Sequence, residues 1–147
     1  SRGDAACGMV ADQSSYNIDR SQGSAIATTV EFSTSDGAGL NWGVVLTDGP
    51  EQTDSAAANS AAVDNTSSTA NGGIGLISVE SIASGTAVLK VQHSSDDITY
   101  ADLITFTGVT ARTSEAISAT GTVNRYVRIQ STGTFTNLVF VAQFSRS

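Results

Sequence analysis

The chain has 147 residues, of which 39% are hydrophobic, 14% charged and 6% aromatic, with a net charge of −7. Its length fits one domain, and its charged fraction is too low for a coiled coil or helical bundle, which needs abundant Glu, Lys, Leu and Arg at helical spacing. Ser and Thr, 21 and 18 in number, make up more than a quarter of the residues, and the apolar residues are clustered, so we expect a small all-β domain with polar faces rather than a disordered chain.

The acidic residues are concentrated in the first part of the chain. Residues 1–64 hold nine acidic residues against Arg2 and Arg20, a net charge of −7, whereas five acidic and five basic residues balance in the remainder. A nucleic-acid-binding protein needs a basic stripe that releases phosphate counterions, and the sequence has none. The same deficit disfavours an anionic membrane, and no apolar run approaches the roughly 18 residues of a membrane span. We therefore expect no nucleic-acid or membrane partner.

The first half of the chain alternates apolar and polar residues with the period of two that is typical of strands. This alternation predicts a weak strand at 12–18, a second at 28–32 and a third at 42–46, with a turn at 35–39 where Asp36 precedes Gly37. Residues 51–73 are small, polar and without period. We expect a long polar loop there, or a short helix near 55–63 with a flexible continuation.

The second half is denser in strand signals. Alternation predicts strands at 74–82, 87–93, 99–106, 114–119, 122–130 and 134–144, with turns at 84–85, 94–97 and 131–133. Turns at such regular spacing favour one all-β domain over residues 1–147, a single antiparallel β-sandwich (jelly-roll or immunoglobulin-like) of about 8–9 strands. We expect its core to contain Trp42, Leu46, Ile77, Val79, Leu89, Val91, Leu103, Phe106, Val127, Ile129, Leu138, Phe140 and Phe144.

No arrangement of residues in the sequence predicts catalysis. His93 is the single histidine, and we expect it to hydrogen-bond the backbone or an Asp side chain of the neighbouring turn. Asp96, Asp97 and Asp102 supply oxygen ligands of the kind that calcium prefers, but adjacent Asp residues at a turn more often cap it. The lone Cys7 lies among small residues and is expected to be buried. We therefore expect no enzyme activity, no cofactor and no metal.

Two groups of residues are candidates for binding. Sugars stack on aromatic rings, so a sugar-binding face is one interpretation of Trp42, Tyr16, Tyr100 and Tyr126, although the core needs most of the aromatic residues.

The second group is the run Arg125-Tyr126-Val127-Arg128. On a strand, Arg125 and Val127 share one side, and Tyr126 and Arg128 share the other. In a chain short of cations, two Arg on one strand favour pairing with the acidic first half, either between strands or between subunits.

Three stretches of the second half carry a resemblance to a known family. They are 88–106 (VLKVQHSSDDITYADLITF), 122–129 (TVNRYVRI) and 135–146 (FTNLVFVAQFSR). Together they resemble a module of structural proteins from tailed-bacteriophage virions, typical of major tail proteins. The opening residues 3–6, Tyr16 and residues 43–46 are similar to the start of the same module.

This resemblance implies a non-enzymatic structural protein of the virion, a self-assembling subunit whose partners are copies of itself and major capsid or tail proteins. A tail subunit and a capsid-decoration (cement) protein on the head shell both stay open, and a carbohydrate- or cell-surface-binding module is the alternative from another class. In either virion role, segment 51–73 would order against a neighbour, and the acidic face would dock on a basic patch. In a tail tube, acidic residues lining the lumen would repel passing DNA. The candidate interface residues are Arg125, Tyr126, Arg128, Arg146, Asp48, Glu51 and Asp54.

Overall fold

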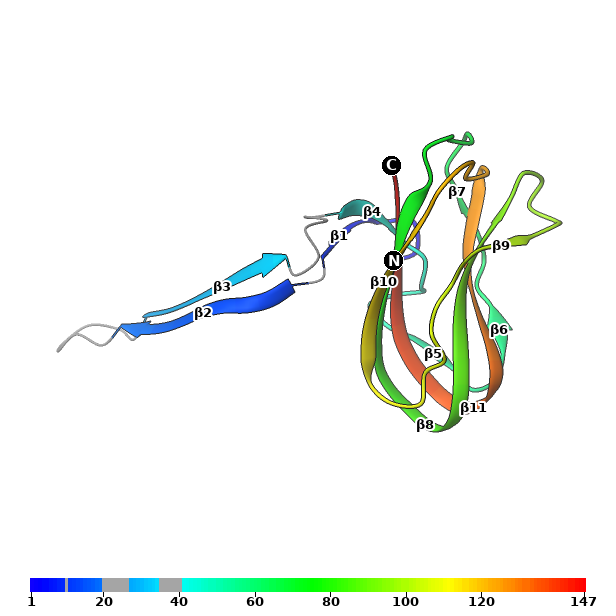
Figure 1. Cartoon of the computed structure of the whole chain (residues 1–147). Helices are drawn as coiled ribbons and strands as arrows, with labels where there is room; N and C mark the ends of the chain where they lie inside the picture. The colour runs from blue at the N-terminus through cyan, green and yellow to red at the C-terminus, as the bar shows by residue number, and fades with distance from the viewer. Residues whose placement is uncertain (10, 20–26, 35–40) are drawn as a thin grey trace.

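The structure, a computed structural model, describes residues 1–9, 11–19, 27–34 and 41–147 (Figure 1). These residues contain strands and no helix, and so no helical segment of the length and hydropathy that crosses a membrane. Nine strands form one antiparallel sheet, and β2 and β3 form a separate pair. The strands are β1 (Ala5–Gly8), β2 (Ala11–Asp19), β3 (Ala27–Thr34), β4 (Asn41–Val45), β5 (Gln52–Asp54), β6 (Ala58–Asn59), β7 (Val63–Asp64), β8 (Gly73–Ser94), β9 (Ala101–Thr105), β10 (Thr113–Ala119) and β11 (Tyr126–Arg146).

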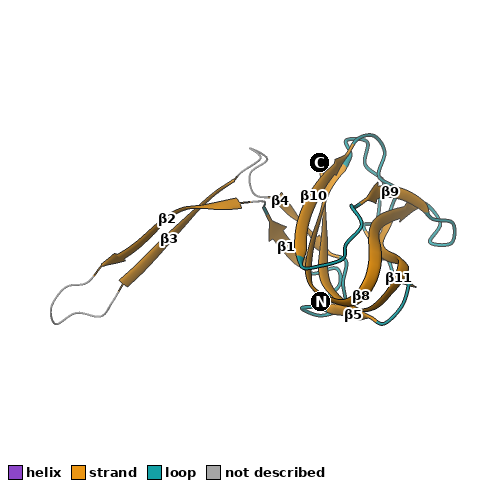
Figure 2. Cartoon of the chain, turned by 60° about the horizontal axis from the view of Figure 1, so that its bottom comes forward, coloured by secondary structure: helices purple, strands orange, loops and turns teal. Residues whose placement is uncertain are grey.

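The long strands β8 and β11 lie at the centre of the sheet. They pair antiparallel along almost their whole length, and both curve back so that the two halves of the pair face each other (Figures 1 and 2). Contact between the halves is direct, because a Cβ on Gly75 would lie 3.3 Å from Val91 Cγ2. The predicted fold class is confirmed as all-β and antiparallel, with the two facing layers continuous as one sheet.

Two glycines let these strands bend without ending. Gly85 and Gly133 have φ angles of 87° and 104°, in the region that favours glycine. A Cβ at Gly85 would lie 2.1 Å from Thr134 O, and one at Gly133 would lie 2.4 Å from Thr86 O, so no larger residue fits. Pairing continues through both bends. Our expectation of chain-reversing turns at 84–85 and 131–133 is therefore wrong, because the glycine at each place lies at a bend within one strand.

The hydrophobic core lies between the facing halves of the sheet. Leu103 is partly buried against it, and the rest of the predicted core is buried, with one exception. Trp42 is 67% exposed, because β4 lies near the edge of the sheet, where its outward positions are uncovered. The buried members are Leu46, Ile77, Val79, Ala87, Leu89, Val91, Ile104, Phe106, Val109, Val123, Val127, Ile129, Phe135, Leu138, Phe140, Ala142 and Phe144.

The segment 51–73 runs along β11 instead of forming the loop or helix that we expected. Its strands β5, β6 and β7 each pair with β11. Between them, Ser60 N donates to Ile129 O at 2.9 Å, and Ile129 N donates to Ser60 Oγ at 3.1 Å. The expectation failed because the backbone groups of this segment are satisfied by pairing with the free edge of β11. Such pairing does not require alternating apolar residues in the segment, so the sequence carries no strand pattern there.

A two-stranded arm leaves the sheet between β1 and β4. Its strands β2 and β3 pair with each other and, among the described residues, with no strand of the main sheet. Gly8 is opposite Asn41 in the β1–β4 pair, so the arm is an insertion at the open end of that hairpin. Both views show it extending away from the sheet (Figures 1 and 2). The strands predicted at 12–18 and 28–32 are confirmed, and the turn predicted at 35–39 lies outside the described residues.

Candidate functional site

Arg125 pairs with the acidic first half of the chain, as predicted. Its Nε and Nη2 donate to the two carboxylate oxygens of Asp64 at 2.7 and 2.6 Å, and its guanidinium lies 4.9 Å from the centroid of the Tyr126 ring. The hydrogen bond from Arg125, aided by one from Thr66 N, lowers the pKa of Asp64 to about 2. This pairing joins β7 to the residue just before β11 within one chain.

Arg128 belongs to a polar network across β8, β9 and β11. Its guanidinium lies 3.7 Å from the centroid of the Tyr100 ring, and its Nε and Nη2 donate to Gln92 Oε1 at 3.0 and 2.8 Å. Gln92 Nε2 in turn donates to Asp102 Oδ1 at 2.7 Å, and Lys90 pairs with Asp102 Oδ2 at 2.7 Å. Among the described residues, no carboxylate forms an ion pair with Arg128.

Arg146 ties the end of β11 to the segment before its start. Its Nη1 donates to Val123 O at 3.0 Å and to Thr69 Oγ1 at 3.1 Å, and its Nη2 donates to Asn124 O at 2.5 Å and to Arg125 O at 3.3 Å. Burial lowers the pKa of Arg146. Its Nε is buried and has no hydrogen-bond partner in the described part of the chain.

A hollow of about 320 Å³ lies beside the exposed Trp42. Asn65 lines it and donates from Nδ2 to Arg125 O at 3.2 Å. Cys7, directly opposite Trp42 on the edge strand β1, is exposed, so our expectation of a buried thiol is wrong. The remaining lining residues are Ala5, Gly43, Val44, Phe144 and Arg146.

The three candidate interface acids lie around another hollow, of about 480 Å³. Asp48 forms an ion pair with Arg2 at 3.1 Å, and Glu51 is exposed. Asp54 is only 7% exposed and accepts a hydrogen bond from Ser131 Oγ at 2.5 Å. Asp54 is therefore engaged inside the chain, contrary to the surface position that an interface residue needs, and Asp48 and Glu51 remain as candidates.

The turn between β8 and β9 is capped by Asp96, as predicted. Its Oδ1 accepts hydrogen bonds from Ile98 N at 3.0 Å and Thr99 N at 2.9 Å, and these bonds lower the pKa of Asp96 to about 2. Burial and the hydrogen bond to Asp97 raise the pKa of Tyr100 to about 12. Across the described ranges, no three His, Cys, Asp or Glu side chains are grouped so as to hold a metal ion.

His93 bonds the backbone, but not that of the neighbouring turn as we expected. Its Nδ1 accepts a hydrogen bond from Asn124 N at 3.2 Å. Burial and, to a smaller extent, the positive charge of Arg146 lower the pKa of His93. Both effects keep the imidazole neutral, which Nδ1 requires in order to accept a hydrogen bond.

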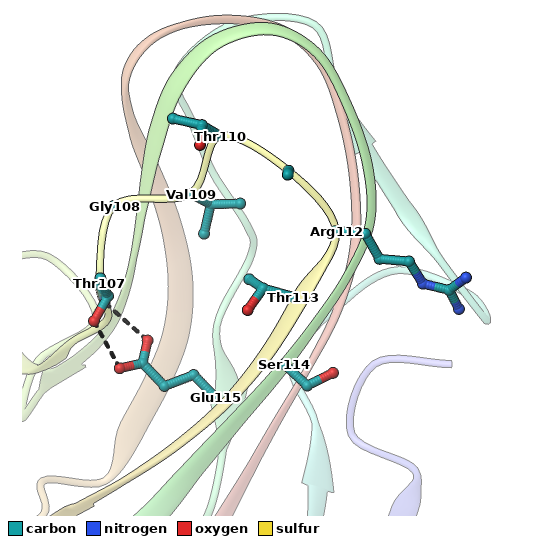
Figure 3. Close-up of a pocket in the computed structure, with 9 residues that line it drawn as sticks. Thr107, Gly108, Val109, Thr110, Arg112, Thr113, Ser114 and Glu115 are labelled. Carbon is teal, nitrogen blue, oxygen red and sulfur yellow. Dashed lines mark hydrogen bonds between the residues drawn. The ribbon is translucent and has the colours of Figure 1, made fainter.

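A further hollow, of about 470 Å³, is lined by residues 107–115, which form the loop after β9 and the start of β10 (Figure 3). Within it, Glu115 accepts hydrogen bonds from Thr107 N and Thr107 Oγ1, both at 2.8 Å. Arg112 points away from the hollow and pairs with Glu80 at 2.9 Å. Both charged groups that line this hollow are thus paired within the chain.

No model of a protein family matches the chain, and the comparison with curated proteins returns no match. The function is therefore argued below from the arm, the sheet edges and the surface side chains of the structure, together with the resemblance of the second half.

Proposed function

We propose that the chain is a non-enzymatic structural subunit of a tailed-bacteriophage virion, which assembles with copies of itself. The observation that carries this proposal is the arm formed by β2 and β3, which pairs with no strand of the main sheet in the described residues. A two-stranded hairpin is marginally stable at best alone in water. An arm of this kind is stabilised when a neighbouring subunit covers it, and a repeating assembly supplies that neighbour.

In the described part of the chain, the main sheet offers a neighbour several open edges. The strand order ends at β1 on one side and β10 on the other, and the short strands β5, β6, β7 and β9 each pair with one neighbour only. Unpaired N–H and C=O groups along such edges accept an additional strand from another chain. An arm and open edges on one subunit are the complementary parts that a self-assembling protein needs.

Charge supports contacts between subunits as well. Three of the acidic residues, Asp12, Asp19 and Glu31, lie on the strands of the arm, whereas Arg128 on the body has no carboxylate partner among the described residues. Opposite charges on two subunits guide their approach and fix the register of the contact. The tail is the favoured location because residues 88–106, 122–129 and 135–146 resemble major tail proteins, and the surface of the head shell is the alternative.

Light scattering over a range of concentrations, followed by electron microscopy, tests this proposal. We expect rings or tubes for a tail subunit, and saturable binding to purified capsid shells for a decoration protein. A chain that stays strictly monomeric at high concentration and binds no shells would refute both versions.

A further inference from the structure

Of the strands of the described main sheet that pair with one neighbour only, β10 is the longest. Soluble proteins keep such edges from pairing with other chains by short length, bulges, prolines and charged residues. β1, β5, β6 and β7 have two to four residues each, and β9 has five, with a register shift against β8. β10 has seven residues in unbroken register with β8, no proline and one charged residue, Glu115. Its edge is therefore the least protected of these.

The one charge of β10 is held within the chain. Glu115 accepts hydrogen bonds from Thr107 N and Thr107 Oγ1, both at 2.8 Å. Figure 3 shows Glu115 on one side of the ribbon, and Arg112 and Ser114 on the other. Arg112 pairs with Glu80 at 2.9 Å, but its side chain is 76% exposed, so a second carboxylate can reach it. The edge of β10 thus has an accessible positive charge at its start.

Within the arm, β3 has the better edge for pairing. Its eight residues include one charged residue, Glu31, which is exposed. β2 instead has two charged residues, and its register against β3 shifts between Gln13 and Ser15, which places an extra residue on β2 and bends it. In the described residues β3 pairs with β2 alone, and the arm extends away from the sheet (Figures 1 and 2). The β10 edge that β3 can reach therefore belongs to a second copy of the chain.

We propose that β3 of one copy pairs antiparallel with β10 of the next copy, with Glu31 opposite Ser114. This inference rests on the self-assembly proposed above, and it names the two strands that meet. When a strand is added to an open edge, hydrogen bonds between the two main chains supply the affinity.

Charge selects this register. Arg112 is two residues from Ser114 and on the same side of β10, so it becomes a diagonal neighbour of Glu31, within reach of long side chains. Opposite charges on two chains fix the register of their contact. Glu115 falls opposite Val30, which is uncharged and 38% exposed, so no like charges face each other across the new pair.

Disulfide cross-linking of whole chains in a Cys7→Ser background tests this pairing. The Glu31→Cys chain is mixed with the Ser114→Cys chain, allowed to assemble and oxidised. Directly opposite residues have Cβ atoms about 4.5–5.5 Å apart, so a small adjustment brings them to disulfide distance. Ser118→Cys is the matched control, because Ser118 is also exposed on β10 and on the same face, but lies about 14 Å further along the strand. We expect a disulfide-linked dimer with Ser114→Cys, and little or none with Ser118→Cys.

Light scattering of the same mixtures separates a wrong pairing from a failure of self-assembly. Loss of one exposed ion pair changes affinity little, so the mixtures should assemble as the wild type does. If they assemble but Ser114→Cys gives no disulfide with Glu31→Cys, or Ser118→Cys gives more, the pairing of β3 with β10 is wrong while self-assembly stands. A wild-type chain that stays monomeric refutes self-assembly, and this pairing with it.

Two further results would overturn the pairing. A disulfide-linked dimer of the Ser114→Cys chain alone would mean that two β10 strands pair with each other. Mixtures that fold, as judged by thermal melts, but do not assemble would mean that the contact depends on single side chains rather than on main-chain hydrogen bonds.

Discussion

Cys7 on β1 lies directly opposite Trp42 on β4, and both side chains are exposed. Residues opposite each other in an antiparallel pair share one face, with Cβ atoms about 4.5–5.5 Å apart. The one thiol and the one indole of the chain are therefore neighbours, close to the position where the arm leaves the sheet. This pair provides a chemical label and an optical reporter at the same place.

The thiol of Cys7 should react with a thiol reagent in the native protein. Because Cys7 is exposed on an edge strand, we expect complete labelling without denaturant, and a change in Trp42 emission when a bulky label is attached. Absorbance of the released reagent measures the labelling, and Cys7→Ser gives the background. A thiol that reacts only after the chain unfolds would contradict the exposed position.

Gly75→Val should destabilise the fold by crowding its two facing layers. A Cβ at Gly75 would already lie 3.0 Å from Ile104 Cδ1 and 3.1 Å from Phe106 Cζ, so the larger side chain should lower the free energy of unfolding by about 1–3 kcal/mol. Chemical denaturation followed by circular dichroism measures this change. Gly108→Ala is the control, because its Cβ would meet Thr86 Cγ2 at an ordinary 3.4 Å. Equal effects of the two substitutions would mean that Gly75 does not face the opposite layer.

Ser131→Ala should remove a buried hydrogen bond that holds β5 and β6 on β11. Ser131 Oγ donates to Asp54 Oδ2 and accepts from Ala58 N at 3.1 Å, so its loss leaves a buried carboxylate short of a donor. We expect the free energy of unfolding to fall by about 1–3 kcal/mol. The exposed Glu51→Gln serves as the comparison in the same denaturation experiment and should change stability little. A similar, small effect of both substitutions would contradict the buried contact.

His93 should make stability depend on pH below neutrality. Its native pKa is lower than the value of 6.5 for a free imidazole, so the unfolded chain takes up the proton first as the pH falls. The contribution of His93 is therefore present in full above pH 6.5 and is lost as the pH drops through the native pKa. Measured from about pH 8 to pH 5, the free energy of unfolding should fall more steeply in the wild type than in His93→Gln. Identical slopes would mean that His93 titrates alike in both states.

The sequence predicted the all-β class and most of the core, because apolar residues at period two report which face of a strand is buried. The sequence could not show whether the chain bends or reverses at Gly85 and Gly133, because glycine is typical of both. The continuous pairing of β8 with β11 shows that the chain bends there. The sequence also failed to predict that Trp42 and Cys7 are exposed. Residues of these types are buried on average, but the strands that carry them, β4 and β1, lie at the edge of the sheet, and the order of strands is not visible in the sequence.

The surface contacts were partly predictable. The charge imbalance between the two halves of the chain predicted that Arg125 pairs with an acidic residue of the first half, whereas the particular partner, Asp64, is given by the pairing of β7 with β11. The network from Arg128 to Gln92 depends on the register of β11 against β8, which no local pattern specifies. The hollow beside Trp42 likewise joins residues from β1, β4, β11 and the segment after β7, which only the folded chain brings together.

The central claim, that the arm drives assembly, is tested most directly by light scattering of a chain without the arm. Replacing residues 9–40 by Asn-Gly keeps the Gly8–Asn41 pair as an ordinary two-residue hairpin. We expect the armless chain to unfold cooperatively and to stay monomeric at concentrations where the full chain forms multi-subunit assemblies. An armless chain that assembles as the full chain does, or a full chain that is monomeric throughout, would contradict the claim.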